Sequence, residues 1–186
     1  MRLPKIVWIA VGVLFAAVSA YIQYEVKVRL HHRQAGGSKR ELGNLKLGDP
    51  APDFSSRDLS EGPVSLVSYR GRKVVLLDFW ATWCGPCRMA MPGLQSLHDE
   101  FKDRGLEILS VNQDEPAVQV RHFINRKKYT VHVILDPDSA IGHRYGVRGI
   151  PTLVVVDKQG LVQWLQVGYS QDQSELRQLL ERLTKE

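Results

Sequence analysis

The two cysteines of the chain lie in one motif, WCGPC, at residues 83–87. Two thiols separated by two residues can form a disulfide and exchange it with a partner protein. A thiolate attacks the partner's disulfide, and the second thiol then attacks the mixed disulfide and releases the partner in reduced form. The motif therefore predicts dithiol–disulfide exchange, which needs two sulfur atoms and no cofactor.

Other uses of a cysteine pair make demands that the rest of the sequence can be checked against. A structural zinc site takes four Cys or His ligands, usually as two close pairs, but the six histidines show no paired metal spacing. Haem attachment needs a His directly after the second Cys, and Arg88 stands there. We therefore expect no metal and no haem. Two uses stay open: a purely structural disulfide, and a Cu(I) ligand pair assisted by Met89 and Met91.

The motif falls between an expected strand and an expected helix. Residues 74–80 (VVLLDFW) are a nearly continuous apolar run, typical of a strand buried on both faces. Apolar spacing from residue 84 to about 104 predicts a helix with Pro92 inside it and Gly105 at its end. We expect this strand and helix to hold the cysteines at their junction.

A cysteine at a helix N-terminus is activated, because unpaired N–H groups and the helix dipole favour its thiolate. Cys84 occupies that position, and Pro86 fits the first turn, where its missing N–H costs little. We expect Cys84 to be the exposed, attacking thiol. Cys87 follows one turn deeper and is expected to be the resolving thiol.

Asp78 interrupts the apolar strand six residues before Cys84. An unpaired carboxylate is costly to bury, so we expect a raised pKa and a role in relaying the proton of Cys87. The alternative is a carboxylate that faces solvent or pairs with a cation such as Lys73.

A second segment, Ile150-Pro151, precedes another apolar strand. A cis bond there would leave the backbone of Ile150 open to pair with an extended substrate, although an Ile-Pro before a strand is also an ordinary strand boundary. We expect a bound substrate to lie against Ile150, Pro151, Trp83, Gly85 and Pro86.

Strands and helices alternate along the chain before it closes with a hairpin and a helix. This order predicts an α/β sandwich with a mixed sheet. The expected strands cover 64–67, 74–80, 107–112, 131–135, 152–157 and 161–167, and the expected helices 84–104, 117–128, 139–145 and 173–185.

The first quarter of the chain has a different composition. A basic tail at residues 1–5 precedes residues 6–24, which carry no formal charge and would reach about 28 Å as a helix, close to the hydrocarbon thickness of a bilayer. We expect an uncleaved transmembrane anchor; a cleaved secretory signal is the alternative. Residues 25–46 form an expected basic linker before a catalytic domain at 47–186. The net charge of +5 owes much to that linker, and no nucleic-acid motif accompanies it.

Together, Asp78-Phe79-Trp80-Ala81, the WCGPC motif, Pro92 and Gly149-Ile150-Pro151-Thr152 resemble the thioredoxin superfamily. The opening segment at residues 48–54, the additional helix and strand at 117–135 and the expected anchor resemble its membrane-tethered TlpA/ResA-like branch. The resemblance implies a three-layer thioredoxin-like sandwich with Pro151 as the cis-proline.

The same resemblance implies a thiol:disulfide oxidoreductase of the bacterial inner membrane with its catalytic domain in the periplasm. Expected partners are exported protein disulfides, as in cytochrome c maturation or copper-site assembly, a membrane electron donor of the thiol-reductase type, and the lipid bilayer through residues 6–24. ResA-like members carry a Glu three residues after the second Cys, where this chain has Ala90, so Asp78 is expected to act in its place. The alternative functions are a peroxiredoxin-like peroxidase, a non-enzymatic Cu(I)-handling module and, from the motif alone, an oxidase or isomerase.

Overall fold

The computed structural model describes residues 18–19, 21–23 and 41–185. Most of the expected anchor at 6–24 and most of the linker at 25–46 lie outside these residues. Within the described part of the chain, no helix has the length and apolar character needed to cross a membrane.

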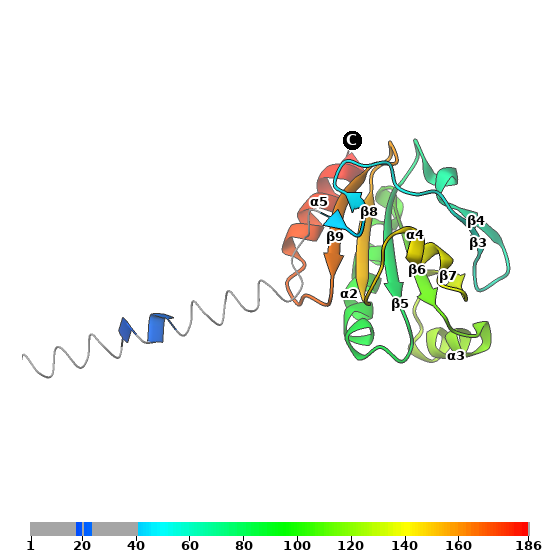
Figure 1. Ribbon diagram of the computed structural model, residues 1–186, viewed down its shortest axis with the longest axis horizontal. Helices are drawn as coiled ribbons and strands as arrows, with labels where there is room; N and C mark the ends of the chain where they lie inside the picture. Colours follow the sequence, from blue (N-terminus) through cyan, green and yellow to red (C-terminus); the bar gives the residue numbers. More distant parts are fainter. Residues whose placement is uncertain (1–17, 20, 24–40, 186) are drawn as a thin grey trace, which may run out of the picture. The chain divides into compact units, whose positions relative to one another are not determined.

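The centre of the fold is a five-stranded sheet with the strand order β7-β6-β5-β8-β9. Strands β5, β6 and β7 run parallel to one another, whereas β8 is antiparallel to both of its neighbours, β5 and β9. The sheet is therefore mixed, as predicted (Figure 1). The strands are β5 (Val74–Trp80), β6 (Leu106–Gln113), β7 (His132–Asp136), β8 (Thr152–Val156) and β9 (Val162–Val167).

The middle strand, β5, is buried along its whole length. Successive side chains alternate between the two faces of a strand, and the core accordingly divides into two clusters. Leu76 and Trp80 belong to one cluster, and Leu77 and Phe79 to the other. Asp78 therefore points to the same face as Leu76 and Trp80.

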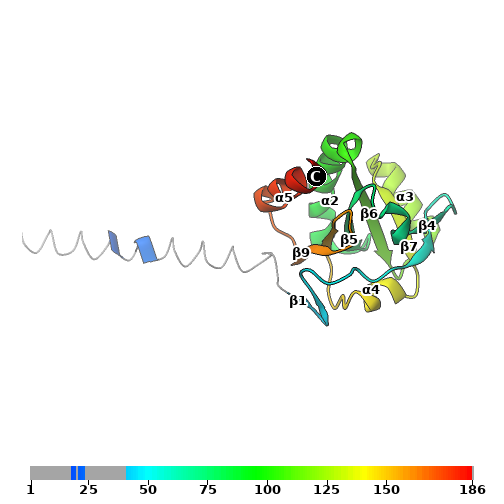
Figure 2. The ribbon, with the colours of Figure 1, turned by 90° about the horizontal axis from the view of Figure 1, so that it is seen from above.

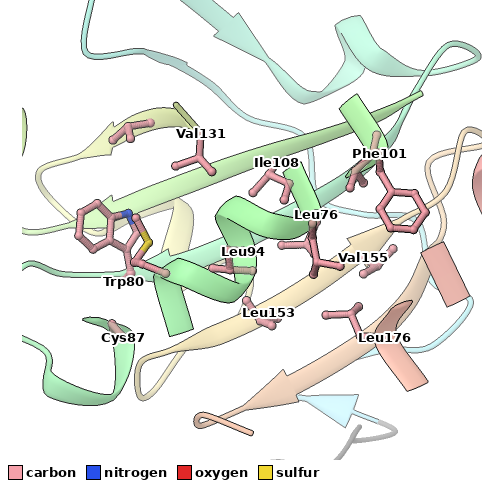
Figure 3. Close-up of a cluster of buried hydrophobic side chains, with 14 of the residues drawn as sticks. Leu76, Trp80, Cys87, Leu94, Phe101, Ile108, Val131, Leu153, Val155 and Leu176 are labelled. Atoms are coloured by element: carbon pink, nitrogen blue, oxygen red, sulfur yellow. The ribbon is translucent and has the colours of Figure 1, made fainter. Parts of the chain in front are cut away.

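Helices cover that first face, and Figure 2 shows them on one side of the sheet with α4 (Ala140–Arg144) on the other. They are α2 (Gly85–Phe101), α3 (Ala117–Lys127) and α5 (Ser174–Lys185), and a 3-10 turn, η2 (Lys102–Arg104), follows α2. Figure 3 shows Leu94 and Phe101 of α2 packed with Leu76 and Ile108 of the sheet. The prediction that Gly105 ends this helical region is confirmed by its φ of +92°.

The folded part of the chain begins earlier than predicted. Residues 41–46, expected to belong to the linker, form a hairpin of β1 (Glu41–Leu42) and β2 (Leu45–Lys46). Leu42 and Leu45 are buried in the core cluster of the second face. The expected boundary at residue 47 therefore differs from the structure, because these two leucines contribute apolar surface to the core. Gly43 and Gly146 approach each other closely beneath this hairpin.

A second hairpin joins β3 (Ser55–Arg57) to β4 (Pro63–Ser65) and leads into a 3-10 turn, η1 (Leu66–Tyr69). The strand expected at 64–67 therefore ends at Ser65. His132 of β7 links this region to the sheet, because its Nδ1 lies 3.1 Å from Glu107 and its Nε2 lies 3.2 Å from Asp58. Hydrogen bonding to Glu107, with a smaller contribution from Asp58, raises the pKa of His132 against the opposing effect of burial.

Candidate active site

The cysteine pair lies at the start of α2, after β5 has ended at Trp80. Cys84 and Cys87 are joined in a disulfide, with their Cα atoms 5.2 Å apart. Cys84 is the N-cap of α2, and its Sγ accepts a hydrogen bond of 3.2 Å from the backbone N–H of Cys87. Pro86 stands in the first turn, as predicted. A sulfur in this position lies close to a backbone N–H and to the positive end of the helix dipole, and both favour its thiolate form.

Both cysteines are buried, although Cys84 was expected to be the more exposed of the two. Cys84 is 5% exposed and Cys87 1%, so the prediction of an exposed Cys84 is wrong for this oxidised form. Cys84 is covered because it is bonded to Cys87 and lies against Ile150. The exposed apolar surface at the site comes instead from Trp83, which is 67% exposed.

The expected substrate-binding segment lies beside Cys84. The Ile150–Pro151 peptide bond is cis, which confirms that part of the prediction. The carbonyl oxygen of Ile150 is 3.8 Å from Sγ of Cys84, and the Thr152 hydroxyl donates a 2.7 Å hydrogen bond to the Gly149 carbonyl. Segments 66 residues apart in the sequence meet here because Thr152 of β8 pairs with Phe79 of β5.

Asp78 is buried, 1% exposed, on the helix-covered face of β5. Its Oδ2 accepts a 3.4 Å hydrogen bond from Ser110, and its Oδ1 has no hydrogen-bond partner among the described residues. Burial raises the pKa of Asp78 to about 7, against the smaller effect of Ser110. The alternative pairing with Lys73 does not occur, because the Lys73 ammonium lies 2.6 Å from Glu107.

A buried carboxylate that was not predicted from the sequence, Glu115, holds the loop in front of the cysteines. It accepts hydrogen bonds from the Thr82 N–H at 2.6 Å, the Thr82 hydroxyl, the Asn112 amide and the Gln119 amide. Glu115 is 5% exposed and lies between β6 and α3. An acidic residue in a short loop is normally expected to be exposed to solvent. Nothing in the sequence therefore indicated that Glu115 would be buried and bonded to Thr82.

The two methionines that suggested a Cu(I) site differ in their exposure to solvent. Met91 is buried in the core, whereas Met89 is 56% exposed. Within the described residues no group of three or more His, Cys, Asp or Glu side chains is placed to hold a metal ion.

A mixed sheet with a dithiol motif at the start of a helix and a cis-proline against its first sulfur defines the thioredoxin-like thiol:disulfide oxidoreductases. Comparison with known proteins agrees with this class. The chain belongs to the AhpC/TSA family, whose sequence profile matches residues 47–165, and it is a TlpA/ResA-like member of the thioredoxin superfamily.

Two curated relatives and one solved structure illustrate the similarity. The thiol-disulfide oxidoreductase ResA of Geobacillus thermodenitrificans is 36% identical over 139 residues, which cover 75% of this chain and 79% of the relative. The thioredoxin-like protein YneN of Bacillus subtilis is 39% identical over 134 residues, covering 70% and 76%. A Chlorobium tepidum structure, assigned as a thiol:disulfide interchange protein DsbE, is 34% identical with a TM-score of 0.71, covering 76% of this chain and 99% of that one.

Proposed function

We propose that this oxidoreductase works as a reductase, which donates two electrons to disulfides of exported proteins such as apocytochrome c or copper-site proteins. The observation that carries the exchange chemistry is the hydrogen bond from the Cys87 N–H to Sγ of Cys84 at the N-cap of α2. The reducing direction is proposed from the Gly85-Pro86 pair between the cysteines, which resembles that of thioredoxin, at the reducing end of the superfamily. In the reduced enzyme the same N–H and the helix dipole stabilise a Cys84 thiolate. Stabilising the thiolate increases the fraction of attacking sulfur at neutral pH.

The reaction begins when the Cys84 thiolate attacks one sulfur of the substrate disulfide. The Cys84–substrate disulfide forms, and the other substrate sulfur leaves as a thiolate that takes up a proton. Cys87 then loses its proton and attacks Sγ of Cys84, which releases the second substrate sulfur and leaves the Cys84–Cys87 disulfide. A dithiol donor restores the reduced pair and is itself oxidised.

Asp78 is proposed to accept the proton that Cys87 loses. It lies on the face of the sheet that α2 covers, and a pKa of about 7 allows it both to accept and to release a proton near neutral pH. This role replaces that of the Glu which ResA-like members carry where this chain has Ala90.

The substrate is proposed to lie along Ile150 and Pro151, with Trp83, Gly85 and Pro86 on its other side. The distance of 3.8 Å between the Ile150 carbonyl and Sγ of Cys84 supports this arrangement, because a strand along Ile150 would place its own sulfur near Cys84. Gly85 has open space where a side chain would begin.

Residues 6–24 are proposed to anchor the chain in the bacterial inner membrane with the catalytic domain outside the cytoplasm. The length and uncharged character of this run support the anchor. A membrane carrier of the thiol-reductase type would then supply the electrons.

The midpoint potential of the Cys84/Cys87 pair tests the reductase proposal. The chain is equilibrated with glutathione or dithiothreitol buffers, and the fraction of reduced pair is measured by thiol alkylation. A value near or below about −250 mV is expected, close to thioredoxin, whereas a value above about −150 mV would identify an oxidant.

Trapping tests the order of attack. A Cys87→Ser variant is expected to accumulate a Cys84–substrate disulfide, and a Cys84→Ser variant is not. Turnover of hydrogen peroxide by the wild type would instead support the peroxidase, and tight Cu(I) binding without disulfide reduction would support the copper module.

A further inference from the structure

A groove of about 230 Å³ lies between one face of α3 and two residues, Thr82 and Arg88, that flank the cysteine motif in the chain. We propose that this groove, named the cationic groove here, binds an acidic segment of the substrate protein beside the disulfide to be reduced. Its walls are Thr82, Arg88, Gln119, His122, Arg126 and Lys127, and Phe123 also lines it. The inference rests on the proposed reductase function and adds the chemistry by which a substrate is recognised.

One wall of the groove follows from the periodicity of α3. Positions 119, 122, 123, 126 and 127 are three or four residues apart and therefore share a helix face. Phe123 is buried, and its ring centroid lies 5.5 Å from that of Trp80 at the end of β5. This contact fixes the cationic face of α3 relative to the strand that leads to the cysteines.

The charges in the groove have one sign. Arg88, Arg126 and Lys127 are exposed, and in the described part of the chain none of them forms an ion pair with a carboxylate. No Asp or Glu lines the groove. The nearby Glu115 already accepts hydrogen bonds from four donors, Gln119 among them.

The helix dipoles explain the position of two of the three cations but not that of the third. Arg126 and Lys127 lie in the last turn of α3, where cations are favoured by the helix dipole. Arg88 lies in the first turn of α2, where the dipole disfavours a cation. An anionic partner that contacts both helices would offset this cost and the mutual repulsion of the three charges.

The position of the groove identifies its occupant as part of the protein that is being reduced. Thr82 and Arg88 flank residues 84–87 in the chain, so an occupant of the groove lies beside the reacting sulfurs. Carboxylates of a chain whose cystine is held at Cys84 and Ile150 can reach this place, and their charge complements the groove.

The test uses three synthetic peptides with the same disulfide, flanked by four Glu, four Gln or four Lys residues. The reduced full-length chain, in a neutral detergent, is assayed for kcat and KM with each peptide at low salt and at 0.5 M salt. Wild type is expected to reduce the Glu peptide about 10-fold more efficiently in kcat/KM than the Gln peptide, through KM. The preference should fall to about twofold at 0.5 M salt, where the screening length is about 4 Å.

The variants are R88E/R126E/K127E and R126E/K127E, the second of which leaves the residue next to Cys87 unchanged. The control K102E/R182E/K185E makes the same change in charge as the triple variant, at exposed positions away from the groove. Lys102 follows the C-terminal end of α2, and α5 ends at the opposite end of the sheet from the C-terminal end of β5 (Figure 1). We expect both groove variants to lose the preference for Glu over Gln, and the control to keep it.

The proposal is overturned if wild type shows no preference for the Glu peptide, or if both groove variants retain it. It is also overturned if the groove variants lose only binding to vesicles that contain phosphatidylglycerol, since the groove would then recognise lipid phosphate. Failure of the reductase function has a different signature, because none of the three peptides would then be reduced by wild type.

Discussion

Replacing Asp78 with Asn removes the only titratable group on β5 and tests whether its carboxyl is protonated in the folded protein near neutral pH. The pKa of Asp78 is raised from 3.8 to about 7 because the side chain is buried. The folded state therefore holds a proton that the unfolded state releases, and stability falls as the pH rises from about 4 to 7. At 1.36 kcal/mol per pKa unit, the full difference corresponds to about 4 kcal/mol.

About 3 kcal/mol of this loss falls between pH 5 and pH 8, according to the same linkage relation. Urea unfolding of the oxidised domain from residue 41, for wild type and D78N, measures the difference in the free energy of unfolding at both pH values. Any constant cost of the Asn amide cancels in this comparison, and so do the other titrating groups. Relative to wild type, the free energy of unfolding of D78N is expected to rise by about 3 kcal/mol as the pH rises from 5 to 8.

A difference between the two proteins that stays constant from pH 5 to pH 8 would refute this reasoning. It would mean that Asp78 is ionised in the folded state throughout this range and cannot take the proton of Cys87. Ser110→Ala is the companion variant. It removes the hydrogen bond to Oδ2 that lowers the pKa of Asp78, so the pH at which the loss of stability ends should move upward, while the pH at which it begins stays near 4.

Three further substitutions test the surroundings of the site. Glu115→Gln should lower the free energy of unfolding by about 2 kcal/mol and reduce kcat/KM, because the loop at Thr82 loses a charged acceptor; urea unfolding and insulin reduction measure this. His132→Gln should cost up to about 1 kcal/mol at pH 5.5 and less at pH 9, since the raised pKa of His132 gives stability below 6.5 that is lost as the pH rises through the folded value. Gly146→Ala should cost about 2 kcal/mol in urea, because φ is +70° and the new Cβ would lie 2.9 Å from the Leu42 carbonyl oxygen.

Each of these substitutions has a control. Thr82→Val keeps the N–H bond to Glu115 and should cost less than Glu115→Gln; an equal cost would contradict the role of the charge. A stability difference between His132→Gln and wild type that is larger at pH 9 than at pH 5.5 would contradict the ion-pair assignment. Gly48 also has a positive φ, but it has open space around it. The cost of Gly48→Ala therefore measures backbone strain alone, and the additional cost of Gly146→Ala measures contact with the first hairpin.

The sequence predicted the parts of the fold that depend on local periodicity. The apolar run of β5, the spacing in α2 and the stop at Gly105 each have one physical interpretation, and the structure agrees with them. The strand at Thr152 and the cis bond at Pro151 were also anticipated from sequence.

The sequence could not predict features that arise from contacts between distant segments. The role of Glu115 becomes evident only in the folded structure, where Thr82, 33 residues earlier in the chain, donates a hydrogen bond to it. Leu42 and Leu45 sit in a short polar stretch, and their burial becomes evident only when the second face of the sheet is assembled. The coverage of Cys84 likewise depends on Ile150, which no local pattern brings to it.

The pairing of Thr152 with Phe79 also determines when during folding the site can appear. The strands β5 and β8 are separated in the chain by α2, η2, β6, α3, β7 and α4. Their pairing therefore closes a long loop and is entropically expensive until much of the sheet exists. The helix that carries the cysteines can form from local contacts, but the surface against which a substrate would be held cannot. Thiol–disulfide exchange activity during refolding is thus a reporter of the completed sheet, and a nascent chain that stops before β8 would carry a dithiol without the proposed binding surface.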